Sequence, residues 1–102
     1  MNNIYLVGRI IKTPSLERNE KGEYFCDITL AVNRTFKNDE GIYDTDFINC
    51  RLYRNVAETS CEYCRKGDLV GIKGSLSSLP SDKVYVMGEK ITYLAMGCNE
   101  DE

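Results

Sequence analysis

The stretch Asp46-Phe47-Ile48-Asn49-Cys50-Arg51-Leu52-Tyr53-Arg54 decides the fold class. Apolar side chains fill its even-numbered positions: Ile48, Cys50 and Leu52. The odd-numbered positions carry two aromatic rings, an amide and a guanidinium: Phe47, Asn49, Arg51 and Tyr53. Because side chains alternate between the two faces of an extended chain, this pattern predicts a strand with one face in a core. The other face carries more aromatic surface than contact with water alone requires.

The segments around this strand complete an all-β pattern with one helix. Residues 55–66 lose the alternation and follow helical spacing, with Asn55 expected to cap the helix and Gly67 to end it. Further strands, the last one interrupted at Gly88, are expected over 4–12, 23–32, 68–76 and 83–94. This order is typical of an OB-fold, a five-stranded Greek-key barrel with one short helix between the third and fourth strands.

The expected first strand, Ile4 to Lys12, is apolar on both faces. Leu6 suits the core, whereas Tyr5 and Val7 fall on the opposite face. A strand with one face in water does not need apolar residues on both sides, so we expect another subunit to cover the second face. Gly8 in the middle predicts a bulge or a close backbone approach.

The chain has 102 residues, and its length and composition indicate one globular domain. We expect this domain over 1–96 and a short acidic tail over 97–102. Thirteen Lys and Arg against sixteen Asp and Glu give a net charge of −3, so the chain as a whole lacks a basic footprint. The sequence has no His, no visible secretory signal and no apolar run of membrane-spanning length. We expect a cytoplasmic protein without a cofactor, a metal or a membrane contact, whose five cysteines are free thiols.

Four motifs follow one another along the chain: Leu6-Val7-Gly8-Arg9, Leu30-Ala31-Val32-Asn33-Arg34-Thr35-Phe36, Asp46-Phe47-Ile48-Asn49-Cys50 and Lys66-Gly67-Asp68. In order and approximate spacing the chain resembles bacterial single-stranded DNA-binding proteins over nearly its whole length. The resemblance implies a binding protein, not an enzyme, that coats single-stranded DNA with little sequence preference in replication, recombination or repair. It also implies a homotetramer in preference to a dimer, associated with the nucleoid in the cytoplasm.

The resemblance assigns base stacking to three rings: Phe36, Phe47 and Tyr53. Polar or basic contacts are implied for Arg34, Arg51 and Arg54. The physics agrees for the row that also contains Asn49, because unpaired bases stack on exposed rings and nearby cations neutralise phosphates. Further expected phosphate contacts are Lys12, Lys37 and Lys73. Strict alternation would turn Arg34 and Phe36 toward the core, so we expect a bulge or twist after Val32.

Two departures from the family pattern change these expectations. The fourth and fifth strands are joined only by residues 77–83, where Leu79 is the bulkiest side chain, so the stacking ring of the family's usual long hairpin is expected to be lost. The family usually ends in a flexible tail whose acidic, Phe-terminated tip recruits other replication proteins. This sequence ends at Asn99-Glu100-Asp101-Glu102, so recruitment through such a tip is not expected. The chain is then either a domain of a longer protein or a minimal member.

Two other functions stay open from the residues alone. The net charge of −3 and the lost ring also suit an OB-fold module that joins a replication or recombination complex and binds nucleic acid weakly. Cys61-Glu62-Tyr63-Cys64 has the spacing of thiol–disulfide enzymes. This motif falls in the second half of the expected helix, away from the end whose dipole lowers a thiol pKa, so packing against the barrel is the favoured interpretation. No combination of nucleophile and base indicates an enzyme.

Overall fold

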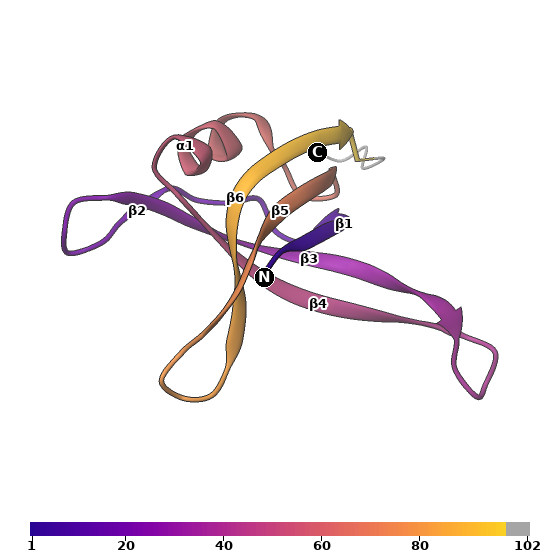
Figure 1. Ribbon diagram of the computed structural model, residues 1–102. Coiled ribbons are helices and arrows are strands. Elements are labelled where there is room, and N and C mark those ends of the chain that lie inside the picture. Colours follow the sequence, from indigo (N-terminus) through magenta and orange to yellow (C-terminus); the bar gives the residue numbers. More distant parts are fainter. Residues whose placement is uncertain (98–102) are drawn as a thin grey trace.

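The computed structural model describes residues 1–97, which form six strands and one helix (Figure 1). The elements are β1 (Ile4–Ile10), β2 (Glu17–Arg18), β3 (Tyr24–Lys37), β4 (Tyr43–Tyr53), α1 (Arg54–Tyr63), β5 (Leu69–Ser78) and β6 (Val84–Ala95). The predicted all-β OB-fold is confirmed, with the helix between the third and fourth of the five long strands. The additional β2 is a two-residue strand that pairs with the start of β3. Of the expected acidic tail over 97–102, residues 98–102 lie outside the described residues.

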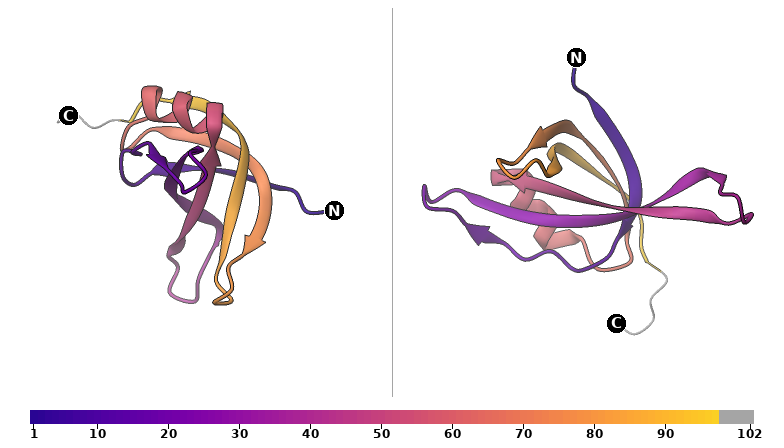
Figure 2. Two further views of the ribbon diagram at one scale, coloured as in Figure 1. Left: turned by 90° about the vertical axis from the view of Figure 1, so that its left-hand side faces the viewer. Right: turned by 90° about the horizontal axis from the view of Figure 1, so that it is seen from below.

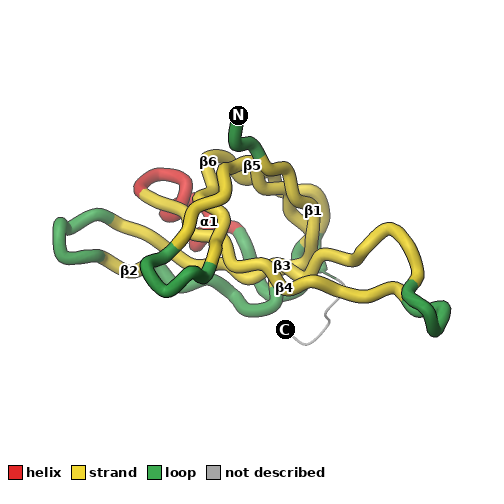
Figure 3. The backbone as a smooth tube through the Cα atoms, turned by 60° about the horizontal axis from the view of Figure 1, so that its bottom comes forward, coloured by secondary structure: helices red, strands yellow, loops and turns green. Residues whose placement is uncertain are grey.

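β1 closes the sheet into a barrel because it pairs on both of its edges (Figure 3). Along Ile4 to Arg9 it runs antiparallel to β5, and at Arg9 and Ile10 it also pairs with β3. The other strands follow in the order β5-β6-β4-β3, with β4 and β6 parallel where Cys50 lies opposite Val86. Strands that are distant in sequence therefore become neighbours, as in a Greek key.

The core fills the barrel, and α1 packs against β3, β4 and β6. The buried apolar side chains of the core come mainly from alternate strand positions: Ile10, Cys26, Ile28, Leu30, Cys50, Leu52, Val70, Ile72 and Val86. Ala57 adds an apolar contact from α1, and Cys64 adds one just after the helix. Burial of these side chains removes apolar surface from water, which is the main favourable term in folding.

Two glycines let strands approach closely. A Cβ atom on Gly8 would come within 2.6 Å of the carbonyl oxygen of Ala31, so the expected close approach is present where β1 crosses β3. A Cβ atom on Gly88 would collide with the Leu52 side chain in the core. The register of β5 and β6 also shifts beside Gly88, so the interruption expected there is a bulge within one continuous strand.

The β3–β4 and β5–β6 hairpins extend beyond the barrel, as does the turn between β2 and β3 (Figures 1 and 2). β3 continues five residues past its expected end at Val32, because Asn33 and Lys37 still pair with β4. β5 and β6 stay paired as far as Ser78 and Val84. These extensions give principal dimensions of 47 × 37 × 22 Å, and they carry side chains of both strand faces into solvent.

The helix differs from expectation at both ends. It begins at Arg54 after an extended Tyr53, and no side chain caps it, so the cap predicted at Asn55 is wrong. It ends at Tyr63, before the predicted end. The Arg65 guanidinium then donates to carbonyl oxygens of the last turn, which is how a cation stabilises a helix C-terminus without being part of the helix.

Candidate nucleic-acid interface

The outer face of β4 carries the row of odd-numbered side chains: Phe47, Asn49, Arg51 and Tyr53. Phe47 is 66% exposed, whereas Leu52 on the inner face is completely buried. Tyr53 is half-buried, because its ring centre lies 6.3 Å from that of Phe25 on β3. An exposed ring toward one end of this row and a half-covered ring at the other offer flat apolar surface on the outside of the barrel.

Each residue of this row lies opposite a residue of β3. Phe47 faces the small side chain of Ala31, so its ring stands uncovered. Asn49 faces Thr29, whose hydroxyl donates to the Asn49 Oδ1 atom over 2.9 Å. That bond leaves the amide nitrogen of Asn49 available as a donor toward a ligand.

Arg51 is fixed from two directions. Its Nε and Nη2 atoms donate to the two carboxylate oxygens of Asp27 over 2.7 and 2.9 Å. Its Cζ atom lies 4.4 Å from the centre of the Phe25 ring, which adds a cation–π contact. The hydrogen bonds to Asp27 raise the pKa of Arg51 above its usual value, so the guanidinium stays charged. Its positive charge is nevertheless balanced locally by the carboxylate.

The irregularity expected after Val32 is present, but Arg34 lies on the face of the β3–β4 hairpin that is opposite Phe47. Between the pairs Asn33–Thr45 and Lys37–Tyr43, β3 advances four residues while β4 advances two. β3 therefore has two extra residues, and an even number keeps the alternation of faces. The expectation that a bulge would turn Arg34 to the face of Phe47 is wrong. Arg34 donates to Asp46 over 2.9 and 3.0 Å, on the side of β4 opposite Phe47.

Phe36 and Lys37 lie near the end of the extended β3–β4 hairpin. Phe36 is 66% exposed, and it stays out of the core because the hairpin has left the barrel at this point. Lys37 pairs opposite Tyr43 on the face of Phe47, and its Nζ atom lies 5.6 Å from the centre of the Tyr43 ring.

The remaining predicted cations are distributed over the surface. Arg54 donates to Glu23 over 2.8 Å, and Lys12 is exposed just after β1. Lys73 lies on β5, which pairs with β1 and β6, so the structure does not bring it together with the row on β4. Its Nζ atom is 3.7 Å from Glu89.

A groove of about 660 Å³ separates the row on β4 from the β5–β6 hairpin. β4 and β3 contribute Asn49, Cys50, Arg51 and Asp27, and the hairpin contributes Leu79, Asp82, Lys83, Val84 and Tyr85. Sequence analysis identified Leu79 but missed Lys83 and Tyr85, which only the parallel pairing of β4 with β6 brings to the row. The short hairpin thus supplies an aromatic side chain, Tyr85, at the groove. The alternation of Tyr85 with buried Val86 was the available signal.

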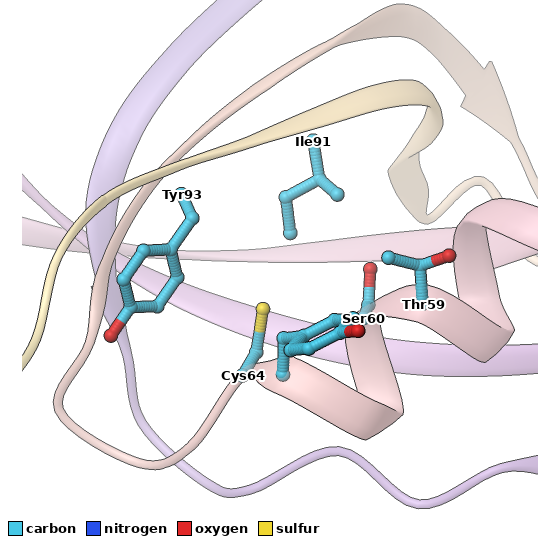
Figure 4. A pocket seen from close by; sticks show the side chains of 6 residues that line it. Thr59, Ser60, Cys64, Ile91 and Tyr93 are labelled. Atoms are coloured by element: carbon cyan, nitrogen blue, oxygen red, sulfur yellow. The ribbon is translucent and has the colours of Figure 1, made fainter.

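A second hollow, of about 440 Å³, lies between α1 and β6 (Figure 4). Its lining is largely apolar and includes Tyr63, Ile91, Tyr93 and the thiol of Cys64. Burial and the nearby Asp68 carboxylate raise the pKa of Cys64, and burial raises that of Cys61. Thiols of this kind are poor nucleophiles, so the pair Cys61 and Cys64 fits packing and not redox chemistry.

Within residues 1–97, no group of three His, Cys, Asp or Glu side chains is arranged to hold a metal ion. In the same part of the chain, no helix has the length and apolar character needed to cross a membrane.

Comparisons with known proteins agree with this architecture. A chain of the single-stranded DNA binding protein from Thermus aquaticus, a deletion mutant, superposes with a TM-score of 0.76 at 24% identity, covering 92% of this chain and 50% of that one. This likeness supports the fold. Single-stranded DNA-binding protein B of Bacillus subtilis (strain 168) is 44% identical over 77 residues, which are 76% of this chain and 68% of the relative.

Longer relatives match over a smaller share of their own length. The single-stranded DNA-binding protein of Halalkalibacterium halodurans is 36% identical, covering 92% of this chain and 61% of the relative. That of Enterococcus faecalis is 45% identical over 78 residues, covering 76% of this chain and 42% of the relative. The family described as "Single-strand binding protein family" matches residues 1–91. With this match over most of its length, on an OB-fold barrel, the chain belongs to the single-strand binding protein family.

Proposed function

We propose that this chain binds single-stranded DNA with little sequence preference, stacking bases on Phe47 and Tyr53. The observation that carries the proposal is the uncovered ring of Phe47, two residues along β4 from Asn49, which lines a groove together with Tyr85. Stacking on an aromatic side chain is worth about 1–3 kcal/mol per base and is available to every base. The names of the three relatives, each a single-stranded DNA-binding protein, support this reading.

Other residues extend the proposed path of the strand. Phe36 offers a further exposed ring on the β3–β4 hairpin, where a DNA strand can pass around the edge of the hairpin. Lys12 and Lys37 are proposed phosphate contacts, whereas Lys73 contacts DNA only if the strand continues onto β5. Arg34, Arg51 and Arg54 contact phosphate only by exchange with the carboxylates that hold them.

The proposed assembly is a homo-oligomer, a tetramer in preference to a dimer. The support for self-association is the outer face of β1, where Tyr5 is 71% and Val7 is 56% exposed, whereas the preference for a tetramer rests on the family. Along Ile4 to Gly8, β1 pairs only with β5, so within the described residues one edge of this segment is unpaired. An apolar face beside a free strand edge is a surface that a second copy can cover.

Within a cell the proposed role is protection of single strands during replication, recombination or repair, in the cytoplasm at the nucleoid. The relatives named above are binding proteins, and none is named for a catalytic activity. These names do not favour the alternative of a protein-interaction module with weak nucleic-acid binding. Partner recruitment through the residues beyond Gly97 is not part of the proposal.

The test is a titration of the wild-type protein with fluorescently labelled oligo-dT and with a duplex of the same length, at two salt concentrations. We expect clear preference for oligo-dT, and light scattering during the titration should give both the subunit count and the nucleotides occluded per assembly. A protein that binds neither probe, or that prefers the duplex, would contradict the proposed function.

A further inference from the structure

The three arginines of the β3–β4 region share one property: each is held by a carboxylate from the opposite segment. We call Arg34, Arg51 and Arg54 the acid-paired arginines. Their partner carboxylates are Asp46, Asp27 and Glu23, at nitrogen–oxygen distances of 2.9, 2.7 and 2.8 Å. Arg34 has a second carboxylate, that of Asp44, at 3.9 Å. A phosphate group must therefore compete with an acid that is already in place.

The surroundings of these pairs contain no surplus of positive charge. The groove beside Arg51 is lined by one further cation, Lys83, and by two acids, Asp27 and Asp82. Along the extended hairpin, residues 33–46 contain two basic residues, Arg34 and Lys37, and four acidic ones. The groove is thus neutral, and the hairpin, whose face opposite Phe47 holds Arg34 and Asp46, is acidic, in agreement with the net charge of −3 for the whole chain.

Affinity for nucleic acid normally rises because cationic side chains displace the cations condensed on the phosphates. When an arginine exchanges a carboxylate for a phosphate, the released carboxylate is left as a new negative charge beside the DNA. The gain from counterion release is then largely cancelled. A duplex, whose bases are hidden in its stack, offers this surface mainly phosphates, whereas a single strand also offers bases for Phe47 and Tyr53.

Resting on the proposed function, we propose that Asp27 and Asp46 are specificity-determining residues that suppress binding through phosphate and so favour single-stranded over duplex DNA. Their carboxylates compete with DNA for Arg51 and Arg34. Stacking then decides the affinity, and stacking is available only on unpaired bases. We expect the fold to tolerate loss of these carboxylates, because exposed ion pairs contribute little to stability.

The test compares two double variants that change the net charge equally. Asp27→Asn with Asp46→Asn removes the competing carboxylates and keeps the side-chain shapes. Glu58→Gln with Glu62→Gln removes two exposed acids of α1 and serves as the matched control. Each protein is titrated with labelled oligo-dT and with a duplex of equal length at about 50 and about 200 mM NaCl, and Asp46→Asn alone is added should the double variant unfold.

We expect the Asp27/Asp46 variant to bind both probes more tightly at low salt than the control variant does. Its log–log salt slope should steepen by about 0.7 per added phosphate contact for oligo-dT and about 0.9 for the duplex. For two added contacts, the slopes differ by about 0.4 in total. Extrapolated from about 1 M down to about 50 mM salt, this difference means that the affinity for the duplex rises about threefold more than the affinity for the single strand.

An equal effect of both double variants, unchanged slopes or weaker binding by the Asp27/Asp46 variant would overturn the inference while leaving the proposed function intact. Absence of oligo-dT binding by the wild type would overturn both.

Discussion

Phe47 is the residue whose removal tests the stacking surface most directly. The ring is 66% exposed and faces only Ala31 across the strand pair, so Phe47→Ala opens no cavity and should leave the free energy of unfolding within about 0.5 kcal/mol of wild type. If one base stacks on this ring, Phe47→Ala makes binding less favourable by about 1–3 kcal/mol. That loss raises the dissociation constant about 5-fold to 150-fold.

Tyr53 should contribute less when changed alone, because Phe25 already covers part of its ring. For the double change Phe47→Ala with Tyr53→Ala, the expected loss is about 2–6 kcal/mol if each ring stacks a base.

The assay is a titration with fluorescently labelled oligo-dT at fixed salt, and circular dichroism verifies the fold of each variant. Tyr63→Ala is the matched control, because Tyr63 is an aromatic residue with 64% exposure that lies on α1 and not on β4. Its affinity should equal that of the wild type. Wild-type affinity of a folded Phe47→Ala protein would refute the stacking argument and would favour a protein-interaction role for this face.

Further predictions concern the stability of the barrel and the state of its ionisable groups. Leu52→Ala, at a fully buried position, should lower the free energy of unfolding in urea by about 2–5 kcal/mol, and a loss below about 1 kcal/mol would place this side chain outside the core. Gly88→Ala should cost about 1–3 kcal/mol in the same assay, because the new methyl group meets the Leu52 side chain; wild-type stability would show that the strands can separate to make room. The Arg34 guanidinium holds the pKa of Asp46 below its usual value, so the ion pair stabilises the fold fully above the unfolded pKa of about 4 and is lost as the pH falls through the lower folded pKa. The stability difference between wild type and Asp46→Asn should therefore shrink between about pH 5 and pH 2, and a constant difference would contradict the pairing. Burial raises the pKa of Cys50 to about 12, so iodoacetamide at pH 8 should modify this thiol only after unfolding, as mass spectrometry can show; rapid labelling of the folded protein would disprove its burial.

Local alternation determined much of the architecture. The inward side of β4 follows from Ile48, Cys50 and Leu52 at every second position, and this pattern also turned Phe47 outward. The apolar character of both faces of β1 is likewise a property of a short segment, whereas the close approach at Gly8 comes from the Ala31 backbone of β3. Because the side-chain period of a strand is a local property of the backbone, such inferences do not depend on how the strands are assembled.

Contacts between distant segments needed the tertiary structure. Asp27 and Arg51 are 24 residues apart, and only the register of β3 with β4 makes them opposite partners and thereby balances the charge of the row. The parallel pairing of β4 with β6 adds Tyr85 to the groove beside Arg51. Register and strand order depend on hydrogen bonds between segments and on the filling of one common core, which no short stretch of sequence contains.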